Sequence, residues 1–126
     1  ALYQMLEQQS NAMIKRIGDI NQFSNQVRQE ILKCIDGNKI DVKRVAQRLS
    51  MSARTLQRRL NETGDTFQRI LDEVRTEFSV QHIKLNRTSI DELAYLLGFS
   101  EPSIYRKTFK RWTGQTPTEY RLSLSA

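Results

Sequence analysis

The chain has 126 residues, of which 38% are apolar and 27% are charged, with only two prolines and five glycines. This composition suits one compact domain or two small subdomains, and it excludes a disordered chain. Cys34 is the only cysteine. An internal disulfide is therefore excluded, no apolar run is long enough for a membrane span, and we expect a cytoplasmic protein.

The formal net charge is +6 and the sequence pI is about 9.8. The charges of residues 1–37 cancel, so the whole excess lies in residues 38–126. Two stretches, Ala53–Leu60 and Tyr105–Trp112, hold several cations and no acid. A surface that serves only solubility usually mixes both signs, so this pattern favours a polyanionic partner over a merely solvated face.

The first predicted element is an amphipathic helix that ends near Gly18. The chain begins at Ala1 rather than at methionine, and we expect a fragment of a longer protein. Residues 1–23 are therefore assigned to a helix or linker from a missing upstream domain. They fit a remnant of an interdomain linker and a dimerisation segment equally well.

Three helices and a long linker helix are predicted next. The expected N-caps are Ser24, Asp41 and Ser52, and glycines follow the first and third of these helices. Residues 24–64 form what we call the first unit. Thr66 then opens a helix that reaches about Leu85, within a linker segment assigned to residues 65–86.

Residues 87–126 form the second unit. Ser89 and Glu92 have the spacing of a capping box at the start of its first helix. Ser100 and Pro102 start the next helix, and a Thr-Pro-x-Glu sequence at residues 116–119 starts the last one. Strand signals are weak throughout, so the predicted fold class is all-α.

The two units repeat one pattern. VAQRLSMS (45–52) matches LAYLLGFS (93–100) at a displacement of 48 residues, from 45 to 93. The alanine lets two helices approach closely, Ser50 or Gly98 allows the turn, and Met51 or Phe99 fills the gap behind it. Each copy continues into a cationic helix. This is the helix-turn-helix shape, present twice.

A helical wheel separates the two faces of each cationic helix. Leu56 and Leu60 point inward in the first unit, and Tyr105, Phe109 and Trp112 point inward in the second. The outward residues include arginine, glutamine and serine, which are types that read base edges in the major groove of DNA. The predicted recognition helices are about 53–61 and 102–112, and the long linker helix would hold them in adjacent major grooves.

SMSARTLQRRLNETGDTFQRILDEVR (50–75) and SIDELAYLLGFSEPSIYRKTFKRWTGQTPTEYR (89–121) resemble the DNA-binding domain of AraC/XylS-type bacterial transcription regulators. The resemblance covers roughly residues 38–122. It implies two helix-turn-helix subdomains joined by a long linker helix, which bind double-stranded promoter DNA. It also implies an upstream effector-binding or dimerisation domain. Ser79 and Tyr105 depart from the family pattern, in which alanine and phenylalanine are usual.

The pattern and the resemblance together give the expected site. The expected base-contacting residues are Arg54, Gln57, Arg58, Ser103, Arg106 and Lys107. The expected phosphate-contacting residues are Ser52, Thr55, Arg59, Ser100, Lys110 and Arg111. The expected structural core comprises Ala46, Leu49, Leu56, Leu60, Ala94, Leu97, Gly98, Phe99, Tyr105, Phe109, Trp112, Pro117 and Tyr120.

Other chemistry finds little support. One histidine, His82, and one cysteine cannot assemble a conventional zinc site, and nothing supports a Cys34–His82 nucleophilic pair. No cofactor or metal is expected. Asp91 and Glu92 are typical of a helix's first turn. Three acids of the linker helix, Asp72, Glu73 and Glu77, form a solvated surface or a contact for RNA polymerase.

The leading hypothesis is sequence-specific DNA binding by a transcription regulator, expected to be an activator located at the nucleoid. A second hypothesis is an architectural protein that binds duplex DNA or RNA without base reading. A third is a protein-interaction module whose basic faces dock an acidic partner. An enzyme is the least favoured class, because the residues form no catalytic constellation.

Overall fold

The computed structural model describes residues 22–124, and every regular element in that range is a helix. Residues 22–33 are helical, and six labelled helices follow them. They are α2 (Val42–Arg48), α3 (Ala53–Glu62), α4 (Phe67–Leu85), α5 (Ile90–Leu96), α6 (Pro102–Thr113) and α7 (Pro117–Leu124). The amphipathic helix expected before Gly18 lies outside the described residues. Within them, no helix is long and apolar enough to cross a membrane.

Most helices begin at the expected caps. The side chains of Asp41, Ser52 and Thr66 each accept the backbone N–H three residues later, at the starts of α2, α3 and α4. Ser89 and Glu92 form a capping box at the start of α5, in which each side chain binds the other residue's backbone. These bonds satisfy N–H groups that have no partner inside the helix.

One expected helix start is wrong, and a second is confirmed for Pro102 but not for Ser100. Ser24 lies inside the helical residues 22–33 rather than at their N-cap, because Phe23 is buried and the helix extends to include it. The N-cap of α6 is Glu101, with no side-chain cap bond, and Ser100 lies exposed in the preceding turn. Pro102 occupies the first turn of α6, where a missing N–H costs nothing.

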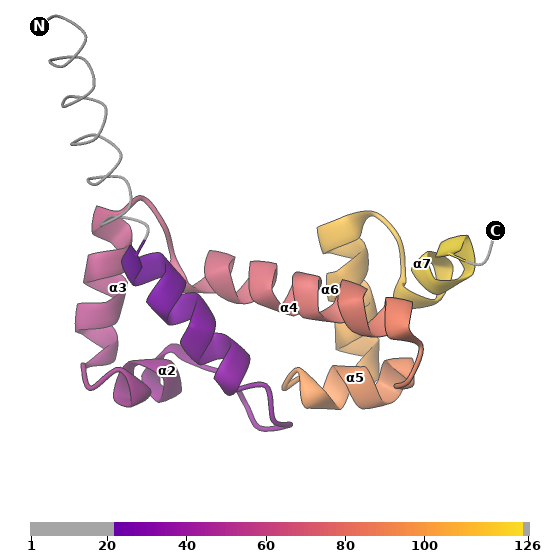
Figure 1. Cartoon of the computed structure of the whole chain (residues 1–126), viewed down its shortest axis with the longest axis horizontal. Helices are drawn as coiled ribbons and strands as arrows, with labels where there is room; N and C mark the ends of the chain where they lie inside the picture. The colour runs from indigo at the N-terminus through magenta and orange to yellow at the C-terminus, as the bar shows by residue number, and fades with distance from the viewer. Residues whose placement is uncertain (1–21, 125–126) are drawn as a thin grey trace, which may run out of the picture.

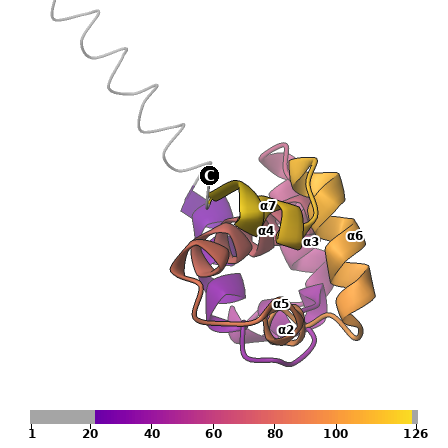
Figure 2. The same cartoon turned by 90° about the vertical axis from the view of Figure 1, so that its right-hand side faces the viewer.

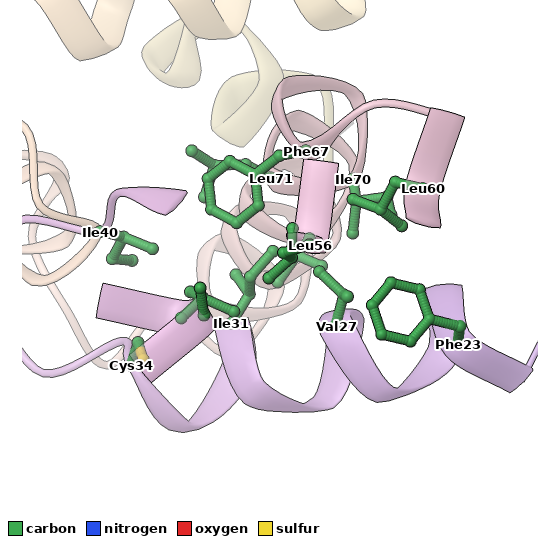
Figure 3. Packing of buried hydrophobic residues seen from close by; sticks show 13 residues of the cluster. Phe23, Val27, Ile31, Cys34, Ile40, Leu56, Leu60, Phe67, Ile70 and Leu71 are labelled. Atoms are coloured by element: carbon green, nitrogen blue, oxygen red, sulfur yellow. The ribbon is translucent and has the colours of Figure 1, made fainter. Parts of the chain in front are cut away.

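The first core cluster joins residues 22–33 to α2, α3 and the start of α4. Figure 3 shows Phe23, Val27 and Ile31 extending from one helix toward the side chains of α3 and α4. Val27, Ile31 and Leu56 have no exposed surface. Burial of such side chains contributes about 1.5–3 kcal/mol each, which explains why this small unit holds its shape.

The second core cluster lies between the end of α4 and helices α5 to α7. Tyr105 and Phe109 of α6 are fully buried, and Leu93 and Leu97 close the cluster from the side of α5. Arg121 ties α7 to the loop before α5, because its guanidinium donates a 2.9 Å hydrogen bond to the backbone oxygen of Thr88.

The helix α4 joins the two units as a single rod of 19 residues. A helix of this length spans about 28 Å. Figure 1 shows α2 and α3 at one end of α4 and α5, α6 and α7 at the other. In Figure 2 the helices α3 and α6 lie on the same side of the molecule. Helices α3 and α6 are therefore displaced from each other along α4 and lie on the same side of the molecule.

The sequence repeat is also a repeat of hydrogen bonds. In the first unit the N–H of Met51 donates to the oxygen of Ala46 (3.0 Å), and in the second the N–H of Phe99 donates to Ala94 (3.1 Å). Both turns contain a residue with positive φ, 59° at Ser50 and 88° at Gly98. The chain thus builds the same helix-turn-helix twice, and only the second copy uses the glycine that suits this conformation.

Candidate nucleic-acid interface

The outer face of α3 carries the residues expected to contact bases in the first unit. Arg54, Gln57 and Arg58 are exposed, while Leu56 and Leu60 are completely buried. Ser52 fixes the start of this helix, because its hydroxyl accepts the N–H of Thr55 at 3.1 Å. The buried leucines anchor the helix, and three long polar side chains are left facing solvent.

Ion pairs do little to fix the arginine side chains of α3 in place. Arg58 lies 4.0 Å from Glu62, and both side chains are 68% exposed, so the pair contributes little. Arg54 forms no ion pair within the part of the chain that the structure describes. Arg59 differs from both, because its guanidinium carbon lies 3.9 Å from the centre of the Phe23 ring. Arg59 therefore flanks the outer face and also packs on the first core cluster.

The outer face of α6 is the counterpart in the second unit. Ser103, Arg106 and Lys107 are exposed on it, as are Lys110 and Arg111 one turn later. Tyr105 and Phe109 are fully buried, with Trp112 half-buried. The aromatic residues thus pack inside the fold rather than forming a platform on which bases could stack.

One expected base reader of α6 is held by a neighbouring helix. A guanidinium nitrogen of Arg106 donates to a carboxylate oxygen of Asp91 in α5. Both side chains are about half exposed, so solvent screens the attraction and leaves the pair easy to exchange for another anion. Asp91 therefore orients Arg106 at the surface and does not bury it.

The remaining expected residues take the following positions. Among the expected phosphate contacts, Ser52, Ser100, Lys110 and Arg111 are exposed and Thr55 is half-buried. The expected core residues that are buried are Ala46, Leu56, Leu60, Ala94, Leu97, Tyr105, Phe109 and Pro117. Those that are half-buried are Leu49, Gly98, Phe99, Trp112 and Tyr120. The exposed and buried sets separate on opposite faces of α3 and α6.

The structure adds residues that the sequence argument did not assign to the site. Ile104 of α6 is 45% exposed and lines a groove between the two units with Gln57 and Asn61 of α3. Arg75 of α4 lies in the same groove. On a helical wheel Ile104 falls outside the inward arc of Tyr105 and Phe109, and this apolar residue on a polar face was the available signal.

The single histidine and cysteine serve packing. The His82 ring stacks on Phe78, with ring centres 3.8 Å apart, and its Nδ1 lies 2.9 Å from the Phe78 backbone oxygen. Cys34 is fully buried, and this burial raises the pKa of its thiol, which disfavours a reactive thiolate. Among the described residues, no group of three or more possible ligands is arranged to hold a metal ion.

This arrangement of helices matches that of a known domain family. The model of a helix-turn-helix domain family matches residues 45–123, which run from within α2 through α3, α4, α5 and α6 into α7. The chain belongs to the AraC-type helix-turn-helix family. The domain has the fold expected of it, since its structural neighbours are AraC-type DNA-binding domains.

Three known proteins illustrate the similarity of this AraC-type domain. The ornithine utilization regulator of Pseudomonas aeruginosa is 35% identical over 121 residues, which are 96% of this chain and 35% of that protein. A DNA-binding transcriptional dual regulator from Escherichia coli K-12 superposes with a TM-score of 0.73 at 25% identity, covering 82% of this chain and 92% of that one. The DNA-binding domain of AdpA, solved in complex with a target DNA, has a TM-score of 0.62 at 28% identity, covering 77% and 90%.

Proposed function

We propose that this AraC-type domain binds a specific double-stranded DNA sequence and belongs to a bacterial transcription regulator. The observation that carries the proposal is the arrangement of α3 and α6. Both helices have buried apolar faces and exposed cationic faces, and they lie on the same side of the molecule at opposite ends of α4. The DNA complex of the related AdpA domain supports the same partner.

The length of α4 supports binding in two successive major grooves. The 19 residues of α4 span about 28 Å, and successive major grooves on one side of B-DNA lie about 34 Å apart. One chain would then carry out what a symmetric dimer of single units usually does. Because α3 and α6 present different side chains, its DNA site is expected to be asymmetric.

Two kinds of contact are proposed for these faces. Arg54, Gln57 and Arg58 from α3 would contact base edges in one groove, and Ser103, Arg106 and Lys107 would do so in the next. The proposed contacts to phosphate come from Ser52, Thr55, Arg59, Ser100, Lys110 and Arg111. Phosphate contacts supply much of the affinity, whereas base contacts select the sequence.

The full-length regulator is expected to contain more than this DNA-binding domain. The chain spans 35% of the length of the ornithine utilization regulator, so a full-length protein of that kind has room for an effector-binding or dimerisation domain. We propose such a domain upstream, and activation of transcription in the cytoplasm through contact with RNA polymerase. A non-enzymatic role fits the family, whose curated relatives are transcription regulators.

A binding-site selection from random duplexes, followed by a mobility-shift titration against salt, tests the proposal. We expect one enriched asymmetric sequence and a binding constant that falls steeply with salt. Equal affinity for the selected and unrelated duplexes would instead indicate an architectural protein. Preference for single strands would reject groove reading, and no duplex binding at low salt would indicate an acidic protein partner.

A further inference from the structure

The loop that follows the helical residues 22–33 contacts the turn of the second unit directly. The backbone N–H of Gly37 donates a 3.1 Å hydrogen bond to the oxygen of Leu96. Two residues further on, a Cβ placed on Gly98 would lie 2.9 Å from the backbone oxygen of Asn38, closer than real Cβ atoms approach. The two units therefore touch backbone to backbone, with no room for a side chain between them.

Arg75 of α4 binds the same turn of the second unit. Its Nε donates a 3.1 Å hydrogen bond to the backbone oxygen of Leu97, and its guanidinium carbon lies 4.5 Å from the centre of the Phe99 ring. The same guanidinium reaches the position of the missing Gly98 side chain, where a terminal nitrogen would be 3.5 Å from a Cβ. The Arg75 side chain thus contacts Leu97 and Phe99, the residues on either side of Gly98 in the turn that leads into α6.

This arginine is half-buried, and no carboxylate forms an ion pair with it in the described part of the chain. Burial lowers the pKa of Arg75, which reflects the cost of moving a cation out of water, and the charge of Asp72 opposes this shift. A carbonyl oxygen and an aromatic ring repay only part of that cost. The residue is therefore better suited to holding a defined geometry than to adding stability.

We propose that Arg75 and Gly98 are positioning residues that fix the angle between α3 and α6, and so set the half-site spacing that the protein accepts. The second part rests on the proposed DNA binding. The rod α4 fixes distance along its own axis, and apolar packing at its two ends is non-directional, so this packing restrains a small rotation of each unit less than directed polar contacts do. The 37–40 loop contacts Leu96 and Gly98, and Arg75 donates a hydrogen bond to Leu97. Together these contacts prevent that rotation.

The angle matters because B-DNA turns about 34° per base pair, at about 10.5 pairs per turn. A change of one base pair between half-sites rotates one major groove by this amount relative to the other. Two helices held at a fixed angle would engage only one spacing. Two loosely joined helices would accept several spacings at a lower affinity for each.

The angle can be measured without DNA. Spin labels on cysteines at the exposed positions Glu62 and Glu101, in a Cys34→Ala background, report the distance between the ends of α3 and α6. We expect one narrow distribution for the parent protein and a distribution at least twice as wide for Arg75→Ala. Arg69→Ala is the matched control, because it removes the same charge from the exposed side of α4.

A second pair of variants covers the case in which Arg75→Ala fails to fold by circular dichroism. Arg75→Lys keeps the charge but loses the planar group that stacks on Phe99, and Phe99→Leu removes the ring instead. Both are expected to widen the distance distribution. A folded Arg75 variant with a distribution as narrow as that of the parent would overturn the proposal.

The spacing is tested on the selected DNA site with one base pair inserted or deleted between its half-sites. The parent protein is expected to lose at least tenfold in affinity, and Arg75→Ala less than threefold. An equal loss in both proteins would reject the link between the angle and the spacing. If the parent selects no duplex at all, the proposed function fails, while the distance measurement still decides whether Arg75 fixes the angle.

Discussion

The hydroxyl groups of Ser79 in α4 and Tyr105 in α6 are neighbours in the second core cluster, and both side chains are fully buried. Neither hydroxyl reaches full hydrogen-bond geometry with any described group, although Ser79 is close enough to lower the pKa of the phenol. The resemblance to the AraC/XylS-type domains implies alanine and phenylalanine at these two positions. The structure shows that the two departures meet.

Removing either hydroxyl alone is expected to destabilise the protein, because the remaining one stays buried without its neighbour. Because the two hydroxyls are close without full hydrogen-bond geometry, we expect Ser79→Ala and Tyr105→Phe each to lower the free energy of unfolding by less than about 1 kcal/mol. The double variant should lie close to the parent, since both polar groups are then gone. Urea unfolding of the four proteins measures this coupling, and strictly additive effects would show that the hydroxyls do not interact.

Alkaline pH should destabilise the protein through Tyr105. Burial raises the pKa of Tyr105 to about 12, with an opposing effect of the Ser79 hydroxyl. An unfolded tyrosine titrates near 10, roughly its ordinary value. Between these values only the unfolded state loses the proton, so the stability present below pH 10 is lost as pH rises toward 12.

The measurement is the free energy of unfolding from pH 9 to 12 for the parent protein and Tyr105→Phe. The parent should lose up to about 1.4 kcal/mol more per pH unit in this range than the variant. The comparison removes the contribution of lysines, which titrate in both proteins. Parallel curves would mean that Tyr105 ionises as easily in the fold as in the unfolded chain.

Loss of a base-reading arginine is expected to change sequence preference. Arg54→Ala and Arg106→Ala should each cost about 1–3 kcal/mol on the selected site and relax the preference at particular base pairs. A repeated binding-site selection with each variant measures this. Asp91→Asn is the control for Arg106, because it breaks the same ion pair but keeps the arginine. An unchanged selection would remove the substituted arginine from the base contacts.

A phosphate contact should behave differently from a base contact. We expect Lys110→Ala to weaken binding to all duplexes alike and to lower the salt dependence, the slope of log K against log salt, by about one. Lys84→Ala is a matched control, since this exposed lysine near the end of α4 lies outside both recognition faces. Equal slopes for the two variants would place Lys110 away from the phosphates.

Two glycines with similar backbone angles should differ in their tolerance of alanine. Gly98 and Gly114 have φ values of 88° and 85°, so a side chain strains the backbone at both. A Cβ at Gly114 meets nothing within 4 Å, whereas one at Gly98 meets Asn38. We expect Gly114→Ala to cost about 1 kcal/mol and Gly98→Ala about 3 kcal/mol by thermal unfolding. Equal costs would show that Asn38 moves aside freely.

The sequence predicted the local structure of this protein well. The caps at Asp41, Ser52 and Thr66 depend on residues three apart, and the repeat depends on a fixed pattern, so both can be found without a fold. The Ser24 prediction failed because a buried aromatic residue one position earlier outweighed the cap signal. A cap contributes about 1 kcal/mol, less than the burial of a phenylalanine.

The contacts between the units could not be predicted in the same way. The grip of Arg75 on Leu97 joins residues 22 positions apart, and nothing in the local pattern marks an arginine that faces a turn rather than solvent. Ile104 was missed because a single apolar residue on a polar face is common on protein surfaces. Such features depend on how whole helices pack, which the spacing of residues within one helix does not encode.

Ile35 packs against both core clusters, so the two halves of the protein share one side chain. Melting of either half exposes it and weakens the other, which favours one cooperative unfolding transition over two separate ones. The halves are consequently poor candidates for exchange between relatives. A hybrid that takes each half from a different parent would need the residue at position 35 and its neighbours on both sides to be inherited together.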